Sequence, residues 1–71
     1  MEEYKERFIT EYNELAERQS KLSAIIQKYL SGTLDFAPTC PISLLQKQNR
    51  AMLRYLNILE ERAEIENIKL S

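Results

Sequence analysis

All of the residues that strongly disfavour helix lie in one short stretch near the middle of this 71-residue chain. Gly32, Pro38 and Pro41 are its only glycine and prolines, and the segments on either side are rich in residues that favour helix. A short connection between two long helices favours antiparallel neighbours. The sequence therefore predicts one all-α domain over residues 1–71, an antiparallel two-helix hairpin. We expect helices over about 2–31 and 41–69 and a loop over about 32–40.

Apolar side chains recur with a 4–3 spacing along both segments, which is typical of a coiled-coil-like seam. The seam positions are Phe8, Tyr12, Leu15, Gln19, Leu22, Ile26 and Tyr29 in the first segment, and Ile42, Leu45, Asn49, Met52, Leu56, Leu59 and Ala63 in the second. In an antiparallel hairpin the numbers of facing residues should sum to about 71. This register predicts that Leu22 lies near Asn49 and that Phe8 lies near Ala63.

The loop carries the signals expected where one helix stops and another starts. Gly32 follows Ser31 and supplies a helix stop, because glycine readily adopts the left-handed conformation found after a helix. We expect the second helix to start near Thr39 or Cys40, with Pro41 in its first turn, where a missing N–H costs nothing. Cys40 is then a small buried or capping residue.

The second helix has a further apolar row about 110° from its seam. The row consists of Leu44, Ala51, Tyr55, Ile58 and Ile65. Together the two rows cover an arc of roughly 200°, which is more than one partner helix can bury. The row could pack loosely under the loop or the first helix. We favour a homo-oligomeric helical bundle in which Leu44, Ala51, Tyr55 and Ile58 meet another hairpin, because two isolated helices would be marginally stable.

Charge is segregated along the chain, although the net charge is only −1. Residues 17–54 hold six basic and two acidic residues, a balance of +4, whereas the two flanks hold four basic and nine acidic residues, a balance of −5. A chain reversal near the middle would bring the basic residues to one end of the hairpin. Such an electropositive end attracts small or extended anions.

The basic residues form two stripes at helical spacing. They are Arg18, Lys21 and Lys28 on the first helix, and Lys47, Arg50 and Arg54 on the second. Binding of phosphate needs several converging cations, preferably including arginine with its forked donors. Two interpretations stay open, a phosphate site and an ordinary solvated face. The scarcity of acidic residues within the stripes argues against the second, because solubilising surfaces normally mix both signs.

Two aromatic residues lie outside the predicted core and could stack on a nucleobase. Phe36 lies in the loop, and Tyr55 lies on the outer apolar row. Tyr12 and Tyr29 occupy seam positions, so we expect core packing for both.

Several classes of function lack their usual residues. The chain has no histidine and one cysteine, so the commonest general base and metal ligand is absent and no cysteine-rich metal cluster exists. One glycine cannot build a glycine-rich phosphate loop. We therefore expect no enzyme, no cofactor and no metal site. No apolar run approaches the ~20 residues of a membrane span, and a cytoplasmic setting fits best.

The chain resembles a family of short phage-encoded helical proteins described as related to a crAss-like phage protein. The matching stretches are 8–15, Lys21-Leu22, the loop 32–41, Leu44-Leu45-Gln46-Lys47-Gln48, Ala51-Met52, Tyr55 and 58–62. More distantly, its build is similar to that of phage anti-CBASS and anti-Thoeris sponges, oligomers that sequester cyclic nucleotide immune signals between subunits. The glycine-tyrosine and isoleucine-lysine motifs of their helical-hairpin group are absent here, so no binding residue carries across.

These resemblances imply a phage immune-evasion protein that sequesters a cyclic di- or trinucleotide in the host cell cytoplasm without catalysis. The predicted ligand-binding residues are Arg18, Lys21, Lys28, Phe36, Lys47, Arg50, Arg54 and Tyr55. The alternative is a helical protein–protein interaction module that acts on a host or virion protein through the outer apolar row. We expect no binding to long nucleic acids, because the distal half of the hairpin is acidic.

Overall fold

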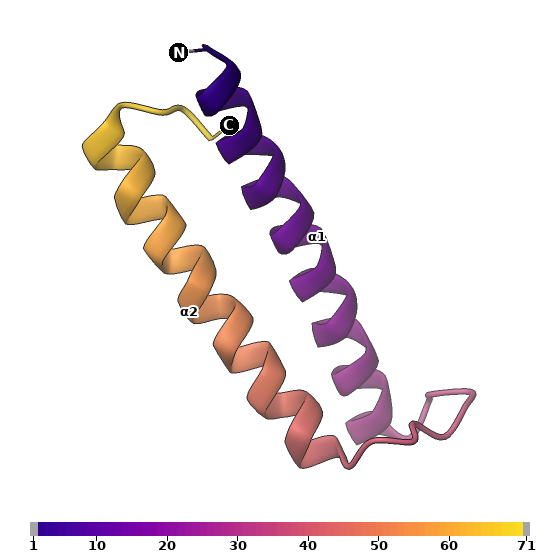
Figure 1. The fold of residues 1–71 in the computed structure, drawn as a ribbon. Coiled ribbons are helices and arrows are strands. Elements are labelled where there is room, and N and C mark those ends of the chain that lie inside the picture. Colours follow the sequence, from indigo (N-terminus) through magenta and orange to yellow (C-terminus); the bar gives the residue numbers. More distant parts are fainter. Residues whose placement is uncertain (1, 71) are drawn as a thin grey trace.

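Two long helices make up most of the molecule, for which a computed structural model describes residues 2–70. Helix α1 spans Glu2–Ser31 and helix α2 spans Ile42–Glu66. The helices lie side by side and antiparallel, so that the start of α1 and residues 67–70 lie at the same end (Figure 1). The predicted all-α two-helix hairpin is confirmed. It is elongated, with extents of 46 × 18 × 17 Å.

The apolar core occupies the half of the hairpin that lies away from the loop. Its buried members are Phe8, Leu15, Leu56, Leu59, Ala63 and Ile68. All except Ile68 are predicted seam positions, and Leu59 is completely buried. Between residues 17 and 54 only Ile26 is buried. Packing is therefore much denser at the acidic end of the hairpin than at the basic end.

A pair of amides separates the two halves of the seam. The Gln19 side-chain N–H donates to the Asn49 side-chain oxygen over 3.1 Å. Asn49 thus bonds to a residue one turn earlier in α1 than the predicted neighbour Leu22, and a polar pair of this kind fixes the register of two helices. With this register the last turn of α1 extends past the start of α2. Tyr29, which we expected in the core, is accordingly 45% exposed.

Helix α1 ends in the way that its sequence predicts. Gly32 has a φ of 76°, which is the left-handed conformation that glycine adopts without a steric penalty. The Thr33 N–H donates to the Lys28 carbonyl over 2.9 Å, and the Gly32 N–H donates to the Tyr29 carbonyl over 3.1 Å. These two bonds form a Schellman motif, which satisfies carbonyls at the helix end.

Helix α2 ends in the same motif, which the sequence interpretation missed. Asn67 has a φ of 62°, and the Ile68 N–H donates to the Ala63 carbonyl over 2.8 Å. The helix therefore stops at Glu66 rather than near residue 69. The reversal turns Ile68 into the core, where its side chain is 7% exposed, and Leu70 packs against the same cluster.

The start of α2 also differs from the prediction. Pro41 is the N-cap residue rather than part of the first turn, and no side chain caps the helix. The Pro41 carbonyl accepts the N–H groups of Leu44 and Leu45, over 3.0 and 3.3 Å. Cys40 lies outside the helix and is exposed. The expectation of a buried or capping Cys40 is therefore wrong, because the helix starts two residues later than Cys40.

The left-handed backbone at Asn67 predicts a position-specific response to substitution. We expect Asn67→Val to lower the free energy of unfolding by about 1–2 kcal/mol, because a β-branched residue resists this conformation. The same change at Asn57, an exposed residue within α2, should have almost no effect, because asparagine and valine have similar helix propensities. Urea unfolding followed by circular dichroism measures both, and equal losses at the two positions would contradict the assignment.

Candidate anion-binding site

Three of the predicted cations line one hollow on the surface of α2. Lys47, Arg50 and Arg54 surround Ala51 in a hollow of about 280 Å³. All three cations are exposed, and within residues 3–70 none of them forms an ion pair with an acidic side chain. Their spacing of three and four residues places them along one side of the helix. The hollow thus offers three uncompensated positive charges to an anion.

The basic stripe on α1 is partly paired with an acidic residue. Lys21 Nζ lies 3.3 Å from Glu17 Oε1, which partly neutralises its charge, although exposed ion pairs of this kind are weak. Arg18 and Lys28 are exposed. The Lys28 carbonyl accepts hydrogen bonds from two loop N–H groups, so this lysine lies at the base of the loop.

The two basic stripes lie at the same end of the hairpin but on different sides of it. Tyr55 bonds to Glu11 on one side, and Tyr12 bonds to Glu60 on the other. At about 100° per residue, the α1 stripe lies on the side of Glu11, whereas the Lys47–Arg54 hollow lies on the outer surface of α2, which is turned away from α1. Every residue that lines the hollow comes from α2. Within one hairpin, therefore, the six cations do not converge.

Phe36 lies at a second, mostly apolar hollow of about 250 Å³ at the loop end. The hollow is lined by Leu22 and Ile25 of α1, Leu45 of α2 and four loop residues, among them Phe36, Thr39 and Cys40. Phe36 keeps 55% of its surface exposed.

Tyr55 and the other members of the outer apolar row differ in what they contact. The Tyr55 hydroxyl donates to Glu11 of α1, while its residue surface remains 41% exposed. Leu44, Ile58 and Ile65 are 51%, 48% and 84% exposed. The interpretation that this row packs under the loop or under α1 is therefore wrong for most of the row. One hairpin leaves these apolar side chains exposed, in a row that Gln48 and Arg62 interrupt.

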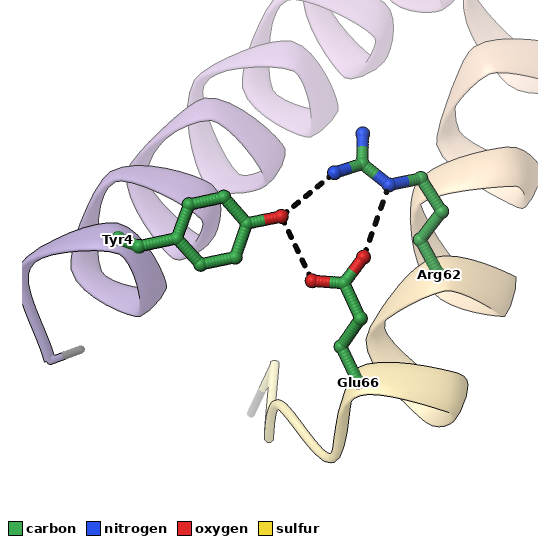
Figure 2. A network of polar contacts seen from close by, with 3 residues as sticks. All are labelled: Tyr4, Arg62 and Glu66. Atoms are coloured by element: carbon green, nitrogen blue, oxygen red, sulfur yellow. Dashed lines mark hydrogen bonds and ion pairs between the residues drawn. The ribbon is translucent and has the colours of Figure 1, made fainter.

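A polar network joins the helices at the acidic end. The Tyr4 hydroxyl donates to Glu66 over 2.8 Å, and Arg62 donates to the Tyr4 oxygen over 2.9 Å and to Glu66 over 3.4 Å (Figure 2). The Arg62 guanidinium also lies 4.9 Å from the centre of the Phe8 ring, which is within the range of a cation–π contact.

Tyrosine hydroxyls bond to glutamates of the opposite helix at three places. The pairs are Tyr4 with Glu66, Tyr12 with Glu60 over 2.6 Å, and Tyr55 with Glu11. The sequence interpretation missed these contacts. They could have been predicted from the tyrosines that lie beside the seam and face glutamates on the other helix. The hydrogen bond to Glu60, followed by burial, raises the pKa of Tyr12 above 10.0. The Tyr12 hydroxyl therefore remains a donor at neutral pH.

The hairpin matches one protein family over most of its length. The model of a family described as Sequestin matches residues 2–65, which include α1, the loop and nearly all of α2. The chain belongs to the Sequestin family. The match thus includes both basic stripes and the outer apolar row as far as Ile65. Searches of curated proteins and of solved structures gave no match to this Sequestin chain.

The described residues of the Sequestin chain contain neither a metal-site cluster nor a membrane-spanning helix. Across residues 2–70, no three or more histidine, cysteine, aspartate or glutamate side chains are grouped so that they could hold a metal ion. Neither of the two helices described is both long enough and apolar enough to cross a membrane.

The Tyr12 contact predicts a pH-dependent contribution to stability. Near neutral pH, Tyr12→Phe should lower the free energy of unfolding by about 1 kcal/mol, the usual net value of one hydrogen bond. The folded-state pKa is raised above 10.0, so this contribution is complete below pH 10 and is lost as the pH rises through the folded-state pKa. The gap between wild type and variant should accordingly close in alkaline solution.

Tyr29→Phe is the matched control, because Tyr29 is exposed and its hydroxyl forms no hydrogen bond among the residues described. We expect a change within about 0.5 kcal/mol for this variant. A gap between wild type and Tyr12→Phe that stayed constant from pH 7 to the alkaline limit of the assay would contradict the assigned bond.

Proposed function

We propose that this Sequestin-family protein is a phage immune-evasion protein that binds and sequesters a cyclic nucleotide signal without catalysis. The observation that carries the proposal is the hollow on α2, where Lys47, Arg50 and Arg54 converge without acidic partners among residues 3–70. The family name is consistent with sequestration of a ligand. The resemblance to phage proteins supports the viral setting and a place in the host cell cytoplasm.

A cyclic di- or trinucleotide suits this set of side chains better than a long nucleic acid. Its two or three phosphates match a small group of cations, and charge-assisted bonds from arginine to phosphate are among the strongest hydrogen bonds in proteins. A duplex would extend past the basic end toward the glutamates of the acidic end. Binding in the sub-micromolar range requires about −8 kcal/mol, which several such bonds together with stacking on Phe36 or Tyr55 can supply.

Sequestration also needs a site that closes around its ligand, and one hairpin does not provide it. The two basic stripes lie on different sides of the hairpin, so Arg18, Lys21 or Lys28 would reach the phosphates from a neighbouring subunit. The exposed apolar row on α2 supplies an interface for that neighbour through Leu44, Ala51, Tyr55 and Ile58. We therefore propose a homo-oligomer whose sites lie between subunits. Sequestration itself requires no reaction and no cofactor.

Isothermal titration with a panel of cyclic di- and trinucleotides tests the ligand. We expect wild type to bind at least one of them, and Arg50→Gln and Arg54→Gln each to weaken that binding by about 10- to 150-fold, because each removes hydrogen bonds to a charged group worth about 1.5–3 kcal/mol. The matched control is Arg7→Gln, which removes the same charge from an exposed arginine at the acidic end and should bind like wild type.

The titration has clear contrary outcomes. Absence of binding to every cyclic nucleotide in the panel overturns the proposal, and so does an equal loss in Arg7→Gln and Arg50→Gln. Retention of a defined host or virion protein by a chain that binds no nucleotide would establish the alternative, a protein–protein interaction module. The exposed row from Leu44 to Ile65 is the observation that favours this second function.

Light scattering tests the assembly separately. Wild type should be larger than one chain, and Ile58→Glu should reduce it to a monomer, because the new carboxylate would lose its water at the interface. Ile58 is better for this purpose than Tyr55, whose hydroxyl bonds to α1. The control is Asn57→Glu, at the neighbouring exposed position on another side of α2. A monomeric wild type would contradict the interface.

A further inference from the structure

The hollow at the loop end has the size and lining of a site for a flat ring. Its volume is about 250 Å³, several times the roughly 30 Å³ that one water molecule occupies in the liquid. The side chains of Leu22, Ile25 and Leu45 give it apolar walls from both helices. Thr39 adds one hydroxyl that can bond to the edge of a ring.

Phe36 gives this hollow an aromatic surface. It lies in the loop, lines the hollow and keeps 55% of its surface exposed, so a ligand can reach its ring. Stacking between a base and an aromatic side chain stabilises binding with little dependence on the base, since every base has a π-face.

Cations lie beside the apolar walls. Ile25 follows Lys21 by four residues and precedes Lys28 by three, so all three side chains lie on the same side of α1. The Lys28 carbonyl accepts the N–H groups of Thr33 and Leu34, over 2.9 and 3.2 Å, which ties the start of the loop to this lysine. A ring in the hollow, against Ile25, would therefore have Lys21 and Lys28 as neighbours along the same side of α1.

Tyr55, the other residue predicted to stack on a base, is poorly placed to do so. The Tyr55 hydroxyl bonds to the carboxylate of Glu11, and Glu11 also belongs to a surface depression that is lined by four glutamates of α1. A phosphate next to Tyr55 would lie beside the Glu11 carboxylate.

From these observations we propose that the loop-end hollow holds a nucleobase of the sequestered ligand, stacked on Phe36, with the adjoining phosphates toward Lys21 and Lys28. This inference rests on the proposed function and deepens it, because it requires the ligand to carry a base. An inorganic or sugar phosphate would find the cations but would leave the hollow empty.

Cys40 provides a direct probe of occupancy. It is the only cysteine of the chain, it is exposed, and it lines the hollow. We expect saturating amounts of whichever cyclic nucleotide of the panel binds to slow the reaction of Cys40 with Ellman's reagent several-fold. Pyrophosphate at the same concentration, which carries charge but no base, should leave that rate unchanged.

Substitution of Phe36 tests the stacking. Phe36→Ala should weaken binding of the same nucleotide by roughly 5- to 150-fold, the range that corresponds to about 1–3 kcal/mol of stacking per base, and Phe36→Tyr should restore it. The control is Leu30→Ala, which removes an apolar side chain that is 64% exposed near the same end of the hairpin but outside the hollow. Circular dichroism checks that each variant keeps its helix content.

The outcomes distinguish a failure of the base site from a failure of the proposed function. Binding that depends on Arg50 and Arg54, but with an unchanged Cys40 rate and an unaffected Phe36→Ala variant, overturns the base site alone. Protection of Cys40 without an effect of Phe36→Ala, or the reverse, overturns the stacked arrangement. A wild type that binds no cyclic nucleotide overturns both the base site and the proposed function.

Discussion

Hydrogen bonds from tyrosine to glutamate across the two helices allow the acidic ends of this hairpin to lie together. Folding the chain in half brings two glutamate-rich ends together, and unpaired carboxylates on neighbouring helices would repel each other. Neutral tyrosine hydroxyls on one helix, facing carboxylates on the other, turn part of that repulsion into attraction. Arg62 adds a positive charge between Tyr4 and Glu66. These contacts lower the electrostatic cost of bringing the two acidic ends together around the apolar core.

The acidic half and the basic half of the hairpin therefore differ in their roles. The acidic half holds the buried cluster of apolar side chains, which Ile68 and Leu70 complete from the C-terminal segment. The basic half contributes little to the core, since Ile26 is its one buried side chain among residues 17–54. Its side chains are instead exposed, in the cationic hollow of α2 and in the apolar hollow beside the loop. The half that stabilises the fold least is the half that is free to bind a ligand.

The 4–3 pattern and Gly32 predicted the hairpin, because hydrophobic periodicity marks the two helices and a glycine after the last turn marks where the first one ends. The end of α2 was missed because Asn67 is a weaker signal than glycine for the same backbone conformation. The seam pattern did not predict the bond between Gln19 and Asn49, because it fixes which side of each helix faces inward but not which polar side chains meet. The spacing of Lys47, Arg50 and Arg54 predicted one ridge correctly. It could not show that the α1 stripe lies on a different side, since that depends on how the two helices are rotated against each other.

Native-state hydrogen exchange, measured amide by amide with NMR, tests the central claim that the two halves differ in stability and in role. In the free protein, the account predicts the slowest exchange around Leu15 and Leu59 and faster exchange around Leu22 and Leu45, because local opening follows packing density. A bound cyclic nucleotide should slow exchange chiefly in the basic half. Equal protection of the two halves in the free protein, or slowing by the nucleotide that is confined to the acidic half, would contradict the account.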